Sequence, residues 1–174
     1  MGKIKVAGYV KLAKLWEKRR QDALPYHYQY YMTKFGSSEE FELADVYVDI
    51  TGNKQLVRRM EMMRLLKDCM EGKIQCIAAQ TKGYLTADTR EFCYLFKFLR
   101  DIGDGIHVIT EDDNYHIDTV KNRDNQLEAL LKMAEDYIAL NPTDYEKWKT
   151  QILSAIERMQ EKEVVGDGFG TKEK

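Results

Sequence analysis

A lysine and an alanine stand at the end of the first apolar run of this chain. The run, residues 4–13, is typical of a short buried strand, and it ends in Lys11-Leu12-Ala13. In open α/β sheets, ligands bind just beyond the carboxyl ends of the strands. Lys11 at that edge suits an anion. Ala13 has no nucleophilic atom, so at this strand end it is either ordinary packing or the place of a missing reactive group.

A second group of cations lies in and just before a segment of helical periodicity, residues 56–70. Acidic residues at 61, 68 and 71 alternate with the basic ones, which favours a solvated face over a phosphate-binding face. So few cations would give little affinity for nucleic acid through counterion release. The basic residues are Lys54, Arg58, Arg59, Arg64 and Lys67.

Metal-ligating and nucleophilic residue types are scattered. The three histidines are isolated, and the three cysteines are widely spaced and odd in number, so we expect no metal site, no cofactor and no disulfide framework. The acidic string EDDN, residues 111–114, favours a solvated loop over a cation site. Free thiols are typical of a reducing compartment. The residues are His27, His107, His116, Cys69, Cys76 and Cys93.

The elements that must position these residues alternate along the chain. Strand patterns at 4–13, 41–50, 73–80 and 106–110 are separated by helical patterns at about 25–35, 56–70 and 88–101. This order predicts an α/β fold, a three-layer sandwich whose four- or five-stranded, mostly parallel sheet is flanked by helices.

The final third of the chain changes character. Two long amphipathic helices are predicted on either side of Asn141-Pro142, within residues 123–162, and a disordered tail over 163–174. They follow an α/β domain over 1–122. Their apolar stripes suit either self-association or partner contact, or packing on the same domain. The candidate contact residues are Leu127, Leu130, Leu131, Tyr137, Trp148 and Ile152.

Bulk composition narrows the function class. The chain has 174 residues and a formal net charge of -2, so no global positive field indicates a dedicated DNA-binding domain. No apolar run is long enough to span a bilayer, and no signal-peptide pattern precedes the first strand. We expect a cytoplasmic protein with no membrane contact.

Several strings resemble the catalytic domain of serine site-specific recombinases, the resolvase/invertase family, over about residues 4–138. YVKLA (9–13) matches that family's Tyr-x-Arg-x-Ser, VYVDITG (46–52) resembles its second strand, and Arg59 follows at the family's spacing. LLKDCMEGKIQCI (65–77) and REFCYLFKFLRDIGDGIHVITED (90–112) resemble its next helices and strands. The resemblance implies a resolvase-like fold.

The departures from that family fall on its chemistry. Ala13 replaces the nucleophilic serine, and KGYLTADT (82–89) replaces a loop whose two arginines grip the scissile phosphate. The arginines are matched by Tyr84 and Ala87, and an adjacent aspartate by Gly83. Without the oxygen nucleophile and the loop cations, the covalent route is closed.

The resemblance therefore implies a catalytically inactive recombinase-like protein. It would act in DNA recombination or mobile-element regulation by binding an active recombinase, a second copy of itself or, weakly, DNA, with Lys11, Arg58, Arg59 and Lys82 as candidate phosphate contacts. Two alternatives remain. One is a phosphate- or nucleotide-handling enzyme that uses Lys11, Asp49 and Arg59, and the other is a pure protein-interaction module.

Overall fold

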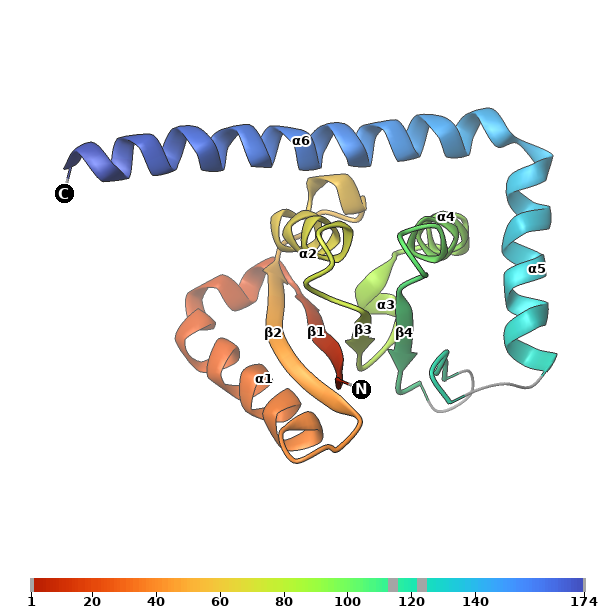
Figure 1. Ribbon diagram of the computed structural model, residues 1–174, viewed down its shortest axis with the longest axis horizontal. Coiled ribbons are helices and arrows are strands. Elements are labelled where there is room, and N and C mark those ends of the chain that lie inside the picture. The colour runs from red at the N-terminus through yellow and green to blue at the C-terminus, as the bar shows by residue number, and fades with distance from the viewer. Residues whose placement is uncertain (1, 113–115, 122–124, 174) are drawn as a thin grey trace.

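The computed structural model describes residues 2–112, 116–121 and 125–173, and the side chains of 125–127 and 162–173 lie outside the description. Its centre is a four-stranded sheet in the order β2-β1-β3-β4, with every pair parallel (Figure 1). The strands are β1 (Ile4–Leu12), β2 (Phe41–Ile50), β3 (Cys76–Ala79) and β4 (His107–Thr110). The predicted α/β class and all four predicted strands are confirmed.

The two outer edges of the sheet differ. Beyond β4 the chain returns antiparallel, and the Thr110 amide donates to the Ile117 carbonyl (2.7 Å) and the Thr119 amide to the Val108 carbonyl (3.1 Å). No described segment pairs with the outer edge of β2. The sheet is therefore closed by its own chain on one side only.

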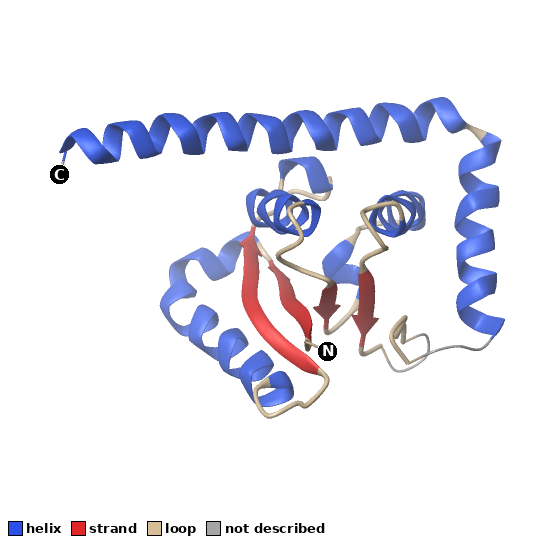
Figure 2. Cartoon of the chain, in the orientation of Figure 1, coloured by secondary structure: helices blue, strands red, loops and turns tan. Residues whose placement is uncertain are grey.

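Helices cover both faces of the sheet, as a three-layer sandwich requires (Figure 2). Alternation along β1 sends Val6 and Val10 into a core beneath α1 (Arg20–Phe35). Ala7 and Tyr9 enter the other core, beneath α2 (Met60–Met70) and α4 (Thr89–Arg100). Each core contains side chains of β1, so the strand that carries Lys11 is packed on both of its faces.

The first helix begins earlier than the sequence predicts. A short 3-10 helix, η1 (Lys14–Arg19), leads directly into α1, so Pro25 lies inside the helix and does not open it. Proline there removes the amide that would bond to the Gln21 carbonyl, in the first turns of the helix. The predicted start near residue 25 was therefore wrong. The predicted end, before Gly36, is confirmed.

The two C-terminal helices are α5 (Asn125–Leu140) and α6 (Pro142–Glu173), and α6 lies across α2 and α4 (Figure 1). The backbone of 163–173, where the sequence predicts disorder, continues α6 as helix. Short helices η2 (Leu56–Arg58) and α3 (Lys82–Leu85) follow β2 and β3. Within the described residues, no helix is both long enough and apolar enough to cross a membrane.

Candidate functional site

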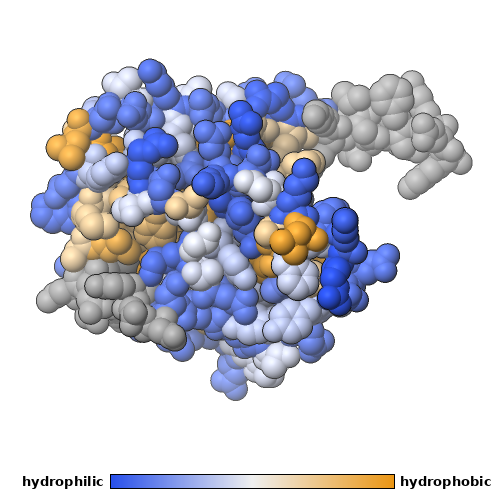
Figure 3. Space-filling model, turned by 180° about the vertical axis from the view of Figure 1, so that it is seen from behind, coloured by the Kyte–Doolittle hydropathy of each residue, from blue (hydrophilic) through white to orange (hydrophobic). Residues whose placement is uncertain are grey.

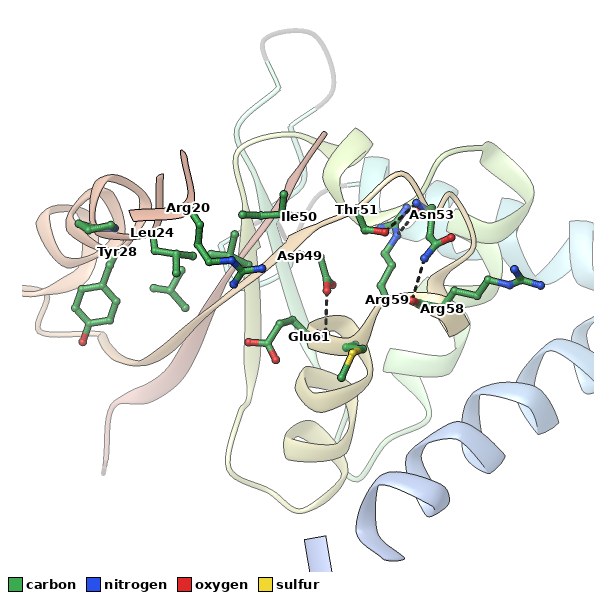
Figure 4. Close-up of a pocket in the computed structure, with 14 residues that line it drawn as sticks. Arg20, Leu24, Tyr28, Asp49, Ile50, Thr51, Asn53, Arg58, Arg59 and Glu61 are labelled. Atoms are coloured by element: carbon green, nitrogen blue, oxygen red, sulfur yellow. Dashed lines mark hydrogen bonds between the residues drawn. The ribbon is translucent and has the colours of Figure 1, made fainter. Parts of the chain in front are cut away.

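The residues that match the recombinase site meet at the carboxyl edge of the sheet. Lys11 and Asp49 are register partners across β1 and β2. Arg59 comes directly before α2. Tyr84 lies in α3, whose carbonyl groups face the Arg59 side chain. The structure thus brings these four positions together, and Figure 4 shows Asp49 directed at the start of α2 and Arg59 directed toward Asn53.

Asp49 is buried and holds the start of α2. Its carboxylate accepts hydrogen bonds from the Glu61 amide and the Met62 amide, both at 2.9 Å, and from the Tyr9 hydroxyl at 2.7 Å. Those two amides belong to the first turn of α2, where helical backbone donors lack partners and the helix dipole favours an anion. Asp49 is therefore a helix cap supplied from a strand, and its oxygen atoms are already engaged.

Tyr9 is the hydroxyl partner of that carboxylate and lies fully inside the core. Burial, followed by the negative charge of Asp49, raises the pKa of the Tyr9 phenol well above its usual range. A phenol held protonated in this way donates to Asp49 at every physiological pH. Its side chain is closed off from solvent in the core, whereas Ala13 is exposed.

Arg59 is the most deeply buried charged side chain of the described chain, with 1% of its surface exposed. Its Nη1 donates to the carbonyls of Tyr84 and Leu85, both at 2.9 Å. Its Nε and Nη2 donate to the carbonyls of Asn53 (3.2 Å) and Lys54 (2.8 Å). The guanidinium thus ties the loop after β2 to α3. It was expected to contact phosphate, and its donors are instead directed at the chain's own backbone.

Lys11 differs from its two charged neighbours. The side chain is half-buried, and among the described residues it makes no hydrogen bond and no ion pair. Burial, followed by the nearby Arg59 charge, lowers the pKa of the Lys11 ammonium. Ala13, two residues on, is exposed and begins the turn into η1, with its carbonyl accepting from the Trp16 amide (2.9 Å). The carboxyl end of β1 therefore presents a cation beside a methyl group.

The segment after β3, residues 80–88, contains one lysine, Lys82, and no arginine. Gly83 and Ala87 are exposed, and Tyr84 is half-buried between the two cores. Lys82, a candidate phosphate contact, is tied to the loop after β4. Its amide donates to Asp112 (2.9 Å), and its ammonium lies 3.7 Å from the same carboxylate.

Arg58 and Lys54 follow β2 in the chain. Together with Lys11, they form the rim of this sheet edge. Both are exposed, and neither side chain has a hydrogen-bond or ion-pair partner among the described residues.

A buried carboxylate that the sequence analysis passed over holds α6 on the body. Glu91 of α4 accepts from the Trp148 indole Nε1 (2.9 Å) and from the Leu56 amide (3.3 Å). Burial raises the pKa of the Glu91 carboxyl. The sequence spacing indicates that Glu91 faces the core, because it lies four and seven residues before Leu95 and Phe98, on the apolar stripe of its helix.

The candidate contact residues of the C-terminal helices divide into two groups. Trp148 (7% exposed) and Ile152 (0% exposed) pack into the core over α2 and α4, so the same-domain alternative holds for this stripe. Leu130 and Leu131 are half-buried, Tyr137 is 39% exposed, and Leu127 lies outside the described side chains.

The face of the molecule shown in Figure 3 is mostly hydrophilic, with small, separate hydrophobic areas. In the described part of the chain, His, Cys, Asp and Glu form no group of three suited to a metal.

This architecture is similar to that of several solved protein structures. The N-terminal catalytic domain of TP901-1 integrase superposes with a TM-score of 0.54 and 17% identity, over 82% of this chain and 97% of that one. This chain has the fold of a serine recombinase catalytic domain.

Two further serine recombinases match less well. The C-terminal catalytic domain of ISC1926 TnpA, an IS607-like serine recombinase, gives a TM-score of 0.48 and 13% identity over 90% of this chain and 99% of that one. A resolvase family site-specific recombinase from Streptococcus pneumoniae gives 0.48 and 17% identity over 91% and 99%. No family model matches the sequence, and no curated protein matches it.

Proposed function

We propose that this protein is a serine-recombinase-like factor without DNA-cleaving activity. It would act in DNA recombination or in the regulation of a mobile element by binding a recombinase, a second copy of itself or DNA. The observation that carries the proposal is the combination at the sheet edge. Ala13 stands where the family's nucleophile is expected, and Arg59, the arginine that matches the family's spacing, directs its donors at backbone carbonyls.

Electrostatics supports the loss of cleavage as strongly as the missing hydroxyl does. Phosphoryl transfer depends on cations placed around the transition-state charge. Among the cations near this edge, Lys11, Lys54 and Arg58 have side chains without a hydrogen-bond or ion-pair partner in the described part of the chain. A water molecule attacking a phosphodiester here would lack the charge stabilisation that two loop arginines provide.

The test is a cleavage assay on supercoiled DNA carrying the recombination sites of the element that encodes this chain. We expect no nicked circles and no covalent protein–DNA adduct after denaturation with detergent. We expect the same of Ala13→Ser, because a restored hydroxyl still lacks the cations at positions 84 and 87. Nicks or adducts from the unaltered chain would refute the proposal, and adducts from Ala13→Ser alone would show that the electrostatic site is intact.

The phosphate-handling alternative gains no support from the geometry. Of the three residues it needs, Asp49 caps α2 and Arg59 holds backbone carbonyls, which leaves Lys11 alone. The binding role is tested by mixing the full chain with the serine recombinase encoded beside it, where one exists, and measuring co-elution and inhibition of that enzyme's DNA cleavage.

A further inference from the structure

The outer edge of β2 forms the floor of an open groove of about 740 Å³. One wall comes from the start of α1, with Leu24, Pro25 and Tyr28, and the other from the start of α2, with Met60 and Glu61. Figure 4 shows Leu24 and Tyr28 projecting from α1 on one side of the strand and Glu61 on the other. Pockets of this size bind small ligands or short peptide segments.

Backbone groups of the strand point into this groove. The Thr51 amide donates to the Leu12 carbonyl of β1, at 3.0 Å. Since the amide and carbonyl of successive residues alternate between the two sides of a strand, those of Val48 and Ile50 point away from β1. No described residue bonds to either outward amide. The Val46 amide also points outward and is covered by its neighbour Asp45, at 2.7 Å.

The open part of the edge is short and sharply bounded. The β1–β2 register shifts between Val6 and Ala7, which places a bulge at Ala44. Arg64 bridges Asp45 beside that bulge, at 3.2 Å. Bulges and charged side chains block further strand pairing. Pairing is therefore possible only along residues 46–50, which suits a segment of about five residues and disfavours a long sheet-to-sheet contact.

Charge indicates the chemistry of the occupant. Arg58 lines the groove at the carboxyl end of β2, and Lys54 lies in the same loop, both without an ion-pair partner among the described residues. The carboxylates that line the groove already have donors, since Glu61 pairs with Arg64 (2.8 Å) and Asp49 caps α2. The apolar middle of the groove and its basic end together fit an apolar segment that carries acidic residues at one end.

We propose that the β2 edge groove binds an extended peptide segment of a partner protein by strand addition. The segment forms main-chain hydrogen bonds with Val48 and Ile50, rests alternate apolar side chains on Leu24 and Tyr28, and places acidic side chains against Arg58. Main-chain bonds supply affinity in this mode, and the pockets for alternate side chains supply selectivity. The inference does not depend on whether the chain cleaves DNA, because it uses the strand edge and not the Ala13 position.

The probes are two synthetic, fluorescein-labelled peptides, Val-Thr-Val-Thr-Val-Glu-Glu and its reversed sequence, one for each strand direction. Binding to the full chain is followed by fluorescence anisotropy. At least one peptide is expected to bind, and the same peptide with every second amide N-methylated is expected to lose binding in one of its two methylation registers. Absence of binding by both peptides at about 1 mM, or no loss in either register, would overturn the proposal.

Paired variants separate the backbone from the side chain. Val48→Pro removes the outward amide while proline stays compatible with an edge strand, whereas Val48→Ala shortens the same side chain and keeps that amide. We expect Val48→Pro to weaken peptide binding about tenfold relative to Val48→Ala. Leu24→Asp should weaken it by a similar factor. The control Leu140→Asp, at an 83% exposed residue at the end of α5, should leave it within about twofold.

Folding and self-association are checked on the same variants by thermal unfolding and by sedimentation. If folded Val48→Pro binds the peptide as well as Val48→Ala does, strand addition is wrong. If neither peptide binds and Val48→Pro instead abolishes a dimer of the unaltered chain, the groove is an interface between copies, and the partner-peptide proposal is overturned.

Discussion

Two clusters of charge lie within the same sheet edge and have opposite roles. In the inner cluster, Arg59 and Asp49 are buried and bonded to backbone groups. In the outer rim, Lys11, Lys54 and Arg58 have no hydrogen-bond or ion-pair partner among the described residues. In the sequence, Lys11 and Asp49 stand near the ends of strand patterns, whereas Lys54, Arg58 and Arg59 follow the second strand, at the start of a helical pattern. The difference teaches that a buried charge at this edge serves the fold through bonds to backbone groups, whereas the less buried charges of the rim leave their donors unused among the described residues.

The same contrast extends to the two tryptophans. Trp148 is buried and donates its indole N–H to Glu91, so it fixes α6 to the body. Trp16 lies in η1, which has no buried residue, and is 38% exposed. One aromatic side chain packs in the core, and the other lies in the turn that follows Ala13, where the Trp16 amide donates to the Ala13 carbonyl.

The largest expected effect is that of Arg59→Met. It leaves four backbone carbonyls without their donor in a buried site, so we expect the free energy of unfolding to fall by about 4 kcal/mol or more. Urea denaturation followed by circular dichroism measures it. The control Arg58→Met, on the rim, should stay within about 0.5 kcal/mol of the unaltered chain. Equal effects of the two substitutions would erase the distinction between the clusters.

A smaller loss is expected from Trp148→Phe. The substitution keeps an aromatic ring in the core and removes the N–H that Glu91 accepts, which should cost about 1–3 kcal/mol. Trp16→Phe is the matched control and should change the free energy of unfolding by less than about 0.5 kcal/mol. Were Trp148 an interface residue and not a core residue, its substitution would change the sedimentation behaviour and leave the denaturation midpoint alone.

The pH dependence of stability isolates Glu91. Because burial raises the pKa of its carboxyl in the folded state, this group adds stability at low pH, and that contribution is lost as the pH rises through the folded-state pKa. The free energy of unfolding of the unaltered chain, minus that of Glu91→Gln, should therefore be greater near pH 4 than near pH 7. Urea titrations of both proteins across this range measure the difference. A constant or reversed difference would contradict the raised pKa.

The smallest effect belongs to the rim. Lys11→Met should leave stability within about 0.5 kcal/mol and, if duplex DNA binds this edge, reduce the dependence of the logarithm of the binding constant on the logarithm of salt concentration by about 0.9. Fluorescence anisotropy with a DNA duplex between about 50 and 200 mM salt measures it. Lys132→Met, at an exposed residue of α5 that pairs with Asp136, is the control. If the unaltered chain and Lys11→Met show the same salt dependence, Lys11 does not contact DNA phosphate.

Some elements of the fold were predicted correctly from the sequence, and others were not. The four strands follow from apolar runs bounded by turns, and the end of α1 follows from Gly36, because periodicity and turn chemistry are local properties. The start of α1 was misplaced, since Pro25, a residue typical of a first turn, lies inside a helix whose first residues, Arg20 to Asp22, are polar and leave no apolar pattern. Glu91 was passed over for a different reason. A carboxylate on an apolar stripe gains its meaning from Trp148, which lies 57 residues away.

By itself, the sequence determined the alternation of strands and helices, the parallel α/β class and the absence of a hydroxyl nucleophile at residue 13. These are properties of residue type and local order. Only the tertiary structure decided that Arg59 bonds to the chain's own carbonyls, that α6 lies on α2 and α4, and that the β2 edge remains open while the β4 edge is covered. The physical reason is that burial and hydrogen-bond partners depend on residues far apart in the chain, whereas local propensity reports only on neighbours.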